Sequence, residues 1–358
     1  MDNKDFWKGR KVFITGHTGF KGSWLSLMLS FLGADVTGYA LKPPTRPSLF
    51  ELCNIGRTID SNIGNILDIK RLKRMIKTAK PEIVIHMAAQ AIVRQSYQDP
   101  LETYHTNMIG TANLFEAVRS CNSIKAVINV TTDKCYDNPG KRAPFKEDEK
   151  LGGYDPYSNS KACSELVTSS YRSSFFNPGS YKKHRVAIAS ARAGNVIGGG
   201  DWAKDRLIPD FVRSILAGKK IDIRNPKAIR PWQHVLDPLK GYLMLAEKLC
   251  QKGVLYGEAW NFGPDAKERR SVEWVVKKLC NMWGDGADYR VDKKIHPHEA
   301  SYLQLDCSKA HKLLAWRPKW HIETALDKIV EWTKTYKDDR KNIKSVCLRQ
   351  INEFMKEE

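Results

Sequence analysis

The chain has 358 residues, 42% of them hydrophobic and 10% aromatic, which indicates a globular protein with one large or two unequal domains. No window approaches the roughly 18 uncharged apolar residues of a membrane span, and residues 1–10 lack the apolar core of a signal peptide. The formal net charge of +19 is compatible with nucleic-acid binding, but no nucleic-acid-binding motif appears, so we expect no nucleic-acid partner.

Strand-like and helix-like patterns alternate through the first half of the chain. The expected strands are residues 11–15, 35–41, 82–89, 124–130 and 185–191, and the expected helices are residues 23–32, 69–78, 106–120 and 156–171. This alternation predicts an α/β fold with a parallel, doubly wound sheet and right-handed crossovers.

The regularity weakens after about residue 195, where glycine, proline and tryptophan become frequent and helices such as 271–283 are separated by irregular segments. We expect a smaller second lobe of mixed α/β structure. The eight cysteines are scattered without CxxC pairs, which predicts reduced thiols in a cytoplasmic protein and no zinc site.

The first motif is TGHTGFKG, which places Gly16, Gly19 and Gly22 between a strand and a helix. Glycines at this spacing permit a tight turn, and the helix N-terminus then faces a pyrophosphate. The alternative is an ordinary glycine-rich turn, but the strand–loop–helix context favours dinucleotide binding.

The acidic residue that usually binds the cofactor ribose is expected about 20 residues further on. The segment YALKPPTRP (39–47) contains no acid and carries Lys42 and Arg46 instead. These cations fit either a 2′-phosphate or plain solvation, so the residues alone leave NAD and NADP open.

The second motif, YSNSK, places Tyr157 and Lys161 four residues apart on an expected helix, where both side chains share one face. A lysine ammonium can lower the pKa of a nearby phenol, and the tyrosinate can take a proton from a substrate hydroxyl. The alternative is a surface Tyr/Lys pair.

Together, TGHTGFKG, HMAAQ (86–90), TTDKCY (131–136) and YSNSK resemble the extended short-chain dehydrogenases/reductases, and within them the nucleotide-sugar 4,6-dehydratases. The segments AAQAIVRQSY, TDKCYDN and RPWQHVLDPLKGYL are similar in particular to the branch that acts on CDP-glucose. The resemblance extends from Lys11 to about Tyr336 and implies a Rossmann-type fold with NAD as cofactor.

The resemblance implies three chemical stages: oxidation at sugar C4, loss of water across C5 and C6, and hydride return to C6. Tyr157 would take the C4 hydroxyl proton with help from Thr132 and Lys161, and Asp133, if held protonated, would be the acid of the elimination. Lys134 stands where many relatives have a glutamate base. It could be a neutral base or a charged stabiliser of the enolate, or it could pair with Asp133 as a loop salt bridge.

Further binding residues follow from the resemblance. It implies cofactor binding by Gly16, Thr18, Gly19, Phe20, Lys21, Gly22, Asn65, Ile66, Ala88, Ala89, Gln90, Asn107, Tyr157 and Lys161. It implies substrate binding by Arg94, Arg192, Asn195, Arg230, Asn261, His298 and Glu299. The planar fork of Arg230 suits a diphosphate, and no third ligand joins His296 and His298 at metal spacing, so we expect no metal.

These expectations divide the chain into an NAD-binding domain (8–190, with segments near 228–250 interleaved), a substrate-binding lobe (191–340) and a basic, solvated C-terminal tail (341–358). We expect a homodimer, or a tetramer, formed through the helices at 106–120 and 157–171. The expected activity is dehydration of CDP-glucose. The alternatives are a sugar-nucleotide epimerase, which would not need Asp133 and Lys134, and a non-catalytic dinucleotide sensor, which would not need Tyr157.

Overall fold

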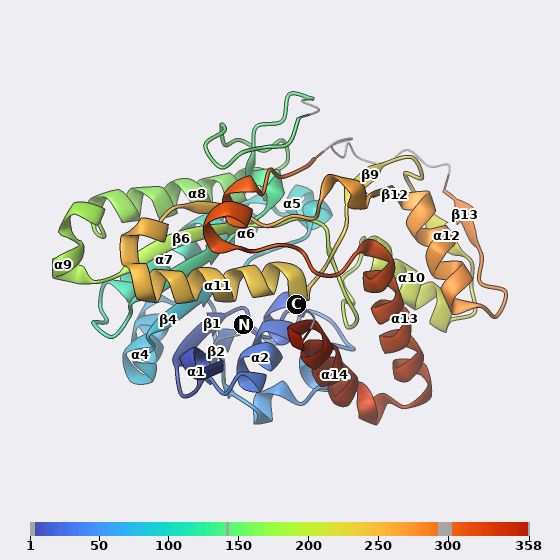
Figure 1. The fold of residues 1–358 in the computed structure, drawn as a ribbon, viewed down its shortest axis with the longest axis horizontal. Helices are drawn as coiled ribbons and strands as arrows, with labels where there is room; N and C mark the ends of the chain where they lie inside the picture. Colours follow the sequence, from blue (N-terminus) through green and yellow to red (C-terminus); the bar gives the residue numbers. More distant parts are fainter. Residues whose placement is uncertain (1–3, 141–142, 293–302, 357–358) are drawn as a thin grey trace.

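The structure is a computed structural model that describes residues 4–140, 143–292 and 303–356. Its centre is a parallel sheet of seven strands in the order β11-β6-β5-β4-β1-β2-β3 (Figure 1). The strands are β1 (Lys11–Thr15), β2 (Asp35–Ala40), β3 (Asp60–Ile63), β4 (Ile83–His86), β5 (Ala126–Val130), β6 (Ala187–Arg192) and β11 (Ala259–Asn261). The chain leaves the central strand β1 in both directions, so the predicted doubly wound α/β fold is confirmed.

Both faces of the sheet are covered by helices, and β4, β5 and β6 are buried along their whole length, whereas the edge strand β3 is not. Along β1, Val12 and Ile14 join the core cluster formed with α2 and α11, whereas Phe13 joins the opposite cluster with α4 and α7. These helices, with α8 beside α7, are α2 (Phe20–Phe31), α4 (Ile69–Ala79), α7 (Gly110–Val118), α8 (Pro156–Ser174) and α11 (Leu236–Lys252).

The remaining elements include three short strand pairs, and Figure 1 shows β9, β12 and β13 on the side of the molecule opposite α9. The pairs are β7 (Val196–Ile197) with β10 (Gln233–His234), β8 (Ile221–Ile223) with β13 (Tyr289–Val291), and β9 (Ile229–Pro231) with β12 (Arg269–Ser271). The other helices are α1 (Lys4–Trp7), α3 (Leu49–Leu52), α5 (Val93–Gln98), α6 (Pro100–Tyr104), α9 (Tyr181–His184), α10 (Leu207–Leu216), α12 (Val272–Trp283), α13 (Ile322–Asp338) and α14 (Ile343–Lys356).

The chain returns to the central sheet after residue 191. Helix α11 packs against β5 and β6, and β11 pairs with β6 as the edge strand. The division of the chain into two domains at residue 190 stays a prediction. The central sheet contains strands from before and after that residue.

The prediction of a solvated tail at residues 341–358 is wrong for its described part, because α14 packs against α2 and α13. The buried side of α14 carries an apolar series at helical spacing, formed by Ile343, Val346, Cys347, Ile351 and Phe354. The density of charges in this segment masks that periodicity in the sequence.

In the described ranges, none of the helices is long and apolar enough to cross a membrane. All eight cysteines are unbridged.

Candidate active site

The first part of the site follows β5 at its carboxyl end, where ligands bind in open parallel sheets. All five residues of β5 are buried, and the chain then turns through a short helical segment, η3 (Asp133–Cys135). The Thr132 hydroxyl accepts a hydrogen bond from the Lys134 amide (3.3 Å) and donates one to Asp133 Oδ1 (3.0 Å). This turn therefore fixes the threonine, the acid and the lysine relative to one another.

Asp133 lies in a site that favours its neutral form. It is only 1% exposed, and its second oxygen, Oδ2, has no hydrogen-bond partner among the described residues. Burial raises the pKa of Asp133, although the charges of Lys134 and Arg230 and the Thr132 hydrogen bond oppose that rise. The side chain of Lys134 is half-buried beside this carboxyl group. A carboxyl group with a raised pKa can donate a proton near neutral pH.

Gly194, in the loop after β6, makes this burial possible. A Cβ atom at residue 194 would lie 1.8 Å from Asp133 Oδ2. We expect Gly194→Ala to lower the free energy of unfolding by about 1–3 kcal/mol, because the acid must move or distort the loop. Urea unfolding measures this. Gly263→Ala is a matched control, since its nearest neighbour would lie at an ordinary 3.4 Å, and an equal loss in both variants would contradict the prediction.

Tyr157 and Lys161 lie in the first turns of α8, which begins at Pro156 and is capped by Asp155. The Lys161 ammonium donates a hydrogen bond to the carbonyl oxygen of Val130 (3.1 Å), so α8 and the end of β5 meet at this side chain. Burial lowers the pKa of Lys161 to about 8, against the negative charge of Glu165, which raises it.

Burial raises the pKa of Tyr157 to about 12, while a hydrogen bond with Thr132 and the charge of Arg206 act in the opposite direction. The phenol is therefore linked through Thr132 to Asp133. The expectation that Lys161 lowers the pKa of Tyr157 is not what the structure shows, because the cation that does so here is Arg206 and Lys161 is bonded to Val130.

Arg206 was missed from the sequence. It directly precedes α10, donates to Asp201 Oδ2 (3.1 Å), and donates to the carbonyl oxygen of Ala91 (3.4 Å) in the loop after β4. Its charge also acts on Lys21. An arginine directly before a helix in an irregular region gave no spacing signal, so only the fold reveals its position.

The glycine loop has the close contacts expected of a phosphate-binding turn. Gly16 has a φ of +80°, and a Cβ atom there would lie 2.7 Å from the Ala88 amide nitrogen. A Cβ atom on Gly22 would lie 2.1 Å from the Gly16 carbonyl oxygen. Helix α2 begins after Gly19 with no side-chain cap and no acidic residue in its first turn, so its amide groups are left for an anion. These residues fit a dinucleotide.

Lys21 and Thr18 make internal contacts. The Lys21 ammonium donates to the hydroxyl of Tyr242 (2.9 Å) on α11, and burial lowers its pKa to about 7, with Lys161 and Arg206 adding to that effect. The Thr18 hydroxyl donates to the carbonyl oxygen of Leu41 (2.8 Å). Lys21 therefore lies among the cations of the catalytic group.

The other predicted cofactor residues form loops around the same edge of the sheet. The Asn107 side chain accepts from the Gln90 amide (2.9 Å) and donates to its carbonyl oxygen (3.0 Å), which braces the loop that holds Ala88 and Ala89. Asn65 caps the next turn. Ile66 packs against Gly110, and Phe20, the first residue of α2, is half-buried. Lys42 is exposed, and the side chain of Arg46 is 86% exposed.

The prediction that Arg192 binds substrate is corrected by its contacts. Its side chain is 4% exposed, its Nε and Nη2 atoms pair with both oxygens of Glu165 (2.9 and 3.0 Å), and Nη1 donates to the Tyr136 hydroxyl (2.7 Å). Both polar atoms of the Asn261 side chain also have protein partners. Its amide oxygen accepts from the Tyr136 hydroxyl (2.8 Å), and its amide nitrogen donates to the Phe145 carbonyl oxygen (2.9 Å). Arg192 and Asn261 therefore have structural contacts within the protein.

Glu165 is the second residue that sequence reasoning missed, although its place four residues after Lys161 was a usable signal. Its carboxylate accepts from Thr131 (2.5 Å) and Arg192. Burial is the largest effect and opposes ionisation, but the Arg192 charge and the hydrogen bonds from Arg192, Thr131 and Ser190 together outweigh it and lower the pKa of Glu165.

Glu165→Gln should lower the free energy of unfolding by about 3–5 kcal/mol, because it leaves the buried Arg192 charge without a counter-charge. In the unaltered protein, a lowered acid pKa stabilises the fold fully above the unfolded-state value of about 4.3, and this contribution is lost as pH falls. Urea unfolding at pH 7 measures the loss. Glu331→Gln, at a half-buried ion pair with Arg349, is the control; an equal effect there would contradict the prediction.

The other residues predicted to bind substrate lie in different surroundings, and two of them lie outside the described residues. Arg230 lies on β9, near enough for its charge to act on Asp133. Arg94 pairs with Asp205 (3.3 Å), and Asn195 follows β6 in a left-handed conformation with φ +44°. His298 and Glu299 lie outside the described residues. Within the described ranges, no group of three or more His, Cys, Asp or Glu side chains could hold a metal ion.

Comparison with known proteins shows the family to which the chain belongs. Residues 13–329 match a family model described as GDP-mannose 4,6 dehydratase. The chain belongs to this family. It is also 53% identical over 356 residues to the CDP-glucose 4,6-dehydratase of Salmonella typhimurium, with 99% of both chains covered.

Two solved structures have the same fold. One is the UDP-glucose 4-epimerase of Thermotoga maritima with UDP-glucose, with a TM-score of 0.78 at 24% identity over 90% of this chain and 98% of that one. The other is a double mutant of the dTDP-glucose 4,6-dehydratase DesIV from Streptomyces venezuelae with NAD and DAU bound. Its TM-score is 0.77 at 22% identity, over 94% of this chain and 99% of that one. The fold thus serves both members of the family and epimerases.

Proposed function

We propose that the protein is an NAD-dependent CDP-glucose 4,6-dehydratase, which converts CDP-D-glucose to CDP-4-keto-6-deoxy-D-glucose and water. The observation that carries the reaction type is the joining of the half-buried Tyr157 to the buried Thr132 and Asp133 in one hydrogen-bonded group with Lys134 beside it. The support for the substrate is the 53% identity, over nearly the whole chain, to a protein named for that substrate.

NAD is the proposed cofactor, and when bound it would accept a hydride from sugar C4 and return it to C6. Gly16, Gly19 and Gly22 would hold its diphosphate at the start of α2, where no side chain caps the amide groups of the first turn. Similar solved structures were obtained with NAD, which supports this choice. Lys161 would orient the nicotinamide ribose.

In the first step, Tyr157 takes the proton of the C4 hydroxyl. Thr132 holds the phenol oxygen through a hydrogen bond, and Arg206 favours the phenolate that the step requires. The positive nicotinamide ring of bound NAD would act in the same direction. Because the pKa of Tyr157 is raised by burial, these opposing charges determine how easily the phenol ionises at neutral pH.

In the second step, the C5 proton and the C6 hydroxyl leave as water. The C4 ketone makes the C5 proton acidic. Lys134 removes it as a base, and Asp133 gives its proton to the departing C6 oxygen. When the hydride returns to C6, the protonated Lys134 gives a proton back to C5. The raised pKa of Asp133 supports this role, because the acid must still carry its proton when the C–O bond breaks.

Substrate profiling tests the proposal. The protein is incubated with NAD and, in turn, CDP-, UDP-, dTDP- and GDP-glucose, and alkaline absorbance near 320 nm reports a 4-keto-6-deoxy product. We expect the signal with CDP-glucose. An epimerised sugar would give no such absorbance, and a non-catalytic sensor would leave all four substrates unchanged, so either result would overturn the proposal.

We propose a homodimer for the assembly. Three large apolar side chains are exposed on neighbouring elements: Leu101 on α6 (71%), Ile109 in the turn before α7 (41%) and Leu166 on α8 (58%). Such a surface suits a two-fold, self-complementary interface. Leu166→Glu should shift the protein from dimer to monomer in sedimentation velocity. Leu255→Glu, at an exposed leucine beyond α11, is the control, and a monomeric unaltered protein would contradict the proposal.

A further inference from the structure

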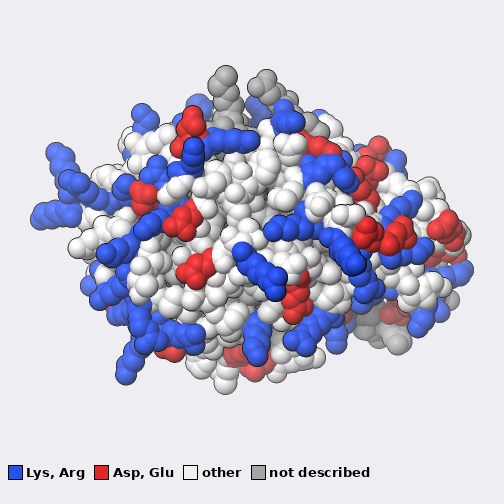
Figure 2. Space-filling view, turned by 90° about the horizontal axis from the view of Figure 1, so that it is seen from below, with Lys and Arg blue, Asp and Glu red and all other residues white. Residues whose placement is uncertain are grey.

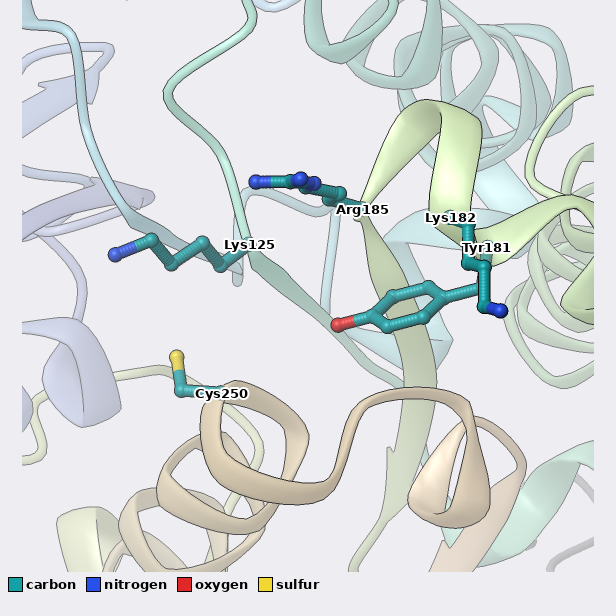
Figure 3. Close-up of a pocket in the computed structure, with 5 residues that line it drawn as sticks. All are labelled: Lys125, Tyr181, Lys182, Arg185 and Cys250. Carbon is teal, nitrogen blue, oxygen red and sulfur yellow. The ribbon is translucent and has the colours of Figure 1, made fainter.

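A cavity of about 360 Å³ lies where strands β5 and β6 begin (Figure 3). It is lined by Lys125, Tyr181, Lys182, Arg185 and Cys250. The proposed catalytic residues follow the other ends of these strands. At about 3.3 Å per residue, five residues of β5 separate the two places by roughly 17 Å, so the cavity is distinct from the candidate active site.

The lining of the cavity is strongly basic. Three of its five residues are cations and none is acidic. Lys125 pairs with Glu82 (2.7 Å), but Glu82 also pairs with Arg10 (2.7 Å), so one carboxylate is shared between two cations. Among the described residues, no carboxylate lies within ion-pair distance of Lys182 or Arg185. Figure 2 shows basic side chains gathered at the end of the molecule that carries α9.

The walls of the cavity are held in place by the fold. Tyr181 and Arg185 lie one helical turn apart, and the Arg185 amide donates to the Tyr181 carbonyl (2.8 Å). Arg185 ends α9 in a left-handed conformation with φ +57°. The ring of Tyr181 packs against Gly253, where an added Cβ atom would lie 2.7 Å from the ring. The phenol, the guanidinium, Lys125 and the Cys250 thiol surround the same space (Figure 3).

These features match the chemistry of a phosphate group. A guanidinium offers a planar fork of donors, an ammonium offers a compact charge, and a phenol adds a neutral donor. The cavity volume lies in the range of small-molecule sites. We propose that this cavity is a second anion site, which binds a small phosphorylated molecule separately from the nucleotide-sugar site.

Equilibrium dialysis with labelled inorganic pyrophosphate tests the proposal, and a parallel arm with CMP separates nucleotides from simple phosphates. The unaltered protein should bind one equivalent more of the preferred ligand than Lys182→Gln/Arg185→Gln, in which affinity at the cavity should fall at least tenfold. Lys77→Gln/Lys183→Gln removes the same charge from exposed lysines outside the cavity, and should bind like the unaltered protein.

Two results would overturn the site. The first is equal binding by the unaltered protein and Lys182→Gln/Arg185→Gln in both arms. The second is an equal loss in the two double variants, which would assign the binding to diffuse surface charge. Dialysis does not depend on turnover, so the test stands apart from the proposed activity. Turnover of CDP-glucose by Lys182→Gln/Arg185→Gln without added phosphate should match that of the unaltered protein.

Discussion

A Lys134→Met protein should still oxidise CDP-glucose at C4 but should fail to exchange deuterium from solvent into C5. The methionine keeps much of the length of the side chain and removes both its basic nitrogen and its charge. Without a base beside the C5 proton, the sugar should stop at the 4-keto stage, and overall turnover should fall by about 10²- to 10⁴-fold.

The experiment is run in deuterium oxide, with product analysed by mass spectrometry and NADH followed at 340 nm. A rise in NADH without label at C5 is the expected pair of observations. Lys146→Met changes an exposed lysine further along the chain and is the control. Full dehydratase turnover by Lys134→Met would overturn the assignment. Lys134→Arg addresses the two roles left open: it keeps the charge but stays protonated and so cannot accept the C5 proton, and rescue would therefore favour charge stabilisation over proton removal.

Tyr157→Phe should block the reaction one stage earlier. The phenylalanine has no oxygen to take the C4 proton, and its hydrogen bond with Thr132 is lost. We expect kcat to fall by about 10²- to 10⁴-fold, with no rise in NADH absorbance even in a single turnover. The absence of NADH distinguishes this variant from Lys134→Met.

The pH dependence of the unaltered protein gives a second measurement of the same groups. Tyr157 acts in its deprotonated form and its pKa is raised, so the oxidation rate should increase as pH rises toward that pKa. Asp133 acts in its protonated form, so elimination should slow as pH rises through its raised pKa.

Tyr104→Phe, at a tyrosine bonded to Asn159 near the same helix, is the control for Tyr157→Phe and should keep its activity. An unchanged kcat in Tyr157→Phe would contradict the assignment.

Sequence periodicity was sufficient for five of the seven strands of the sheet and for its main helices, but it missed β3, whose residues are exposed or half-buried, and β11, which spans three residues. The helix expected at 69–78 is α4, and the strand expected at 124–130 contains β5. It was insufficient for α14, whose apolar face is interrupted by many charges.

The residues of the candidate site were also predicted only in part. Thr132, Asp133, Tyr157 and Lys161 are close in sequence to recognisable motifs, and the fold brings them together. Arg192 was misassigned because its partner, Glu165, lies 27 residues away on another element. Arg206 carries no local signature at all. The role of a charged side chain cannot be predicted from sequence spacing when its ion-pair partner is distant in the sequence.

The two halves of the chemistry occupy separate structural units. Tyr157 and Lys161 belong to a long helix packed on the sheet, whereas Asp133 and Lys134 belong to one short turn after β5. The hydroxyl of Thr132 links them, and α8 packs against the turn. Evolution can therefore exchange the residues of this turn while leaving the oxidising helix and the sheet intact. Such modularity gives a physical reason why this architecture diversified into enzymes that share one redox step and differ in the chemistry of the later steps.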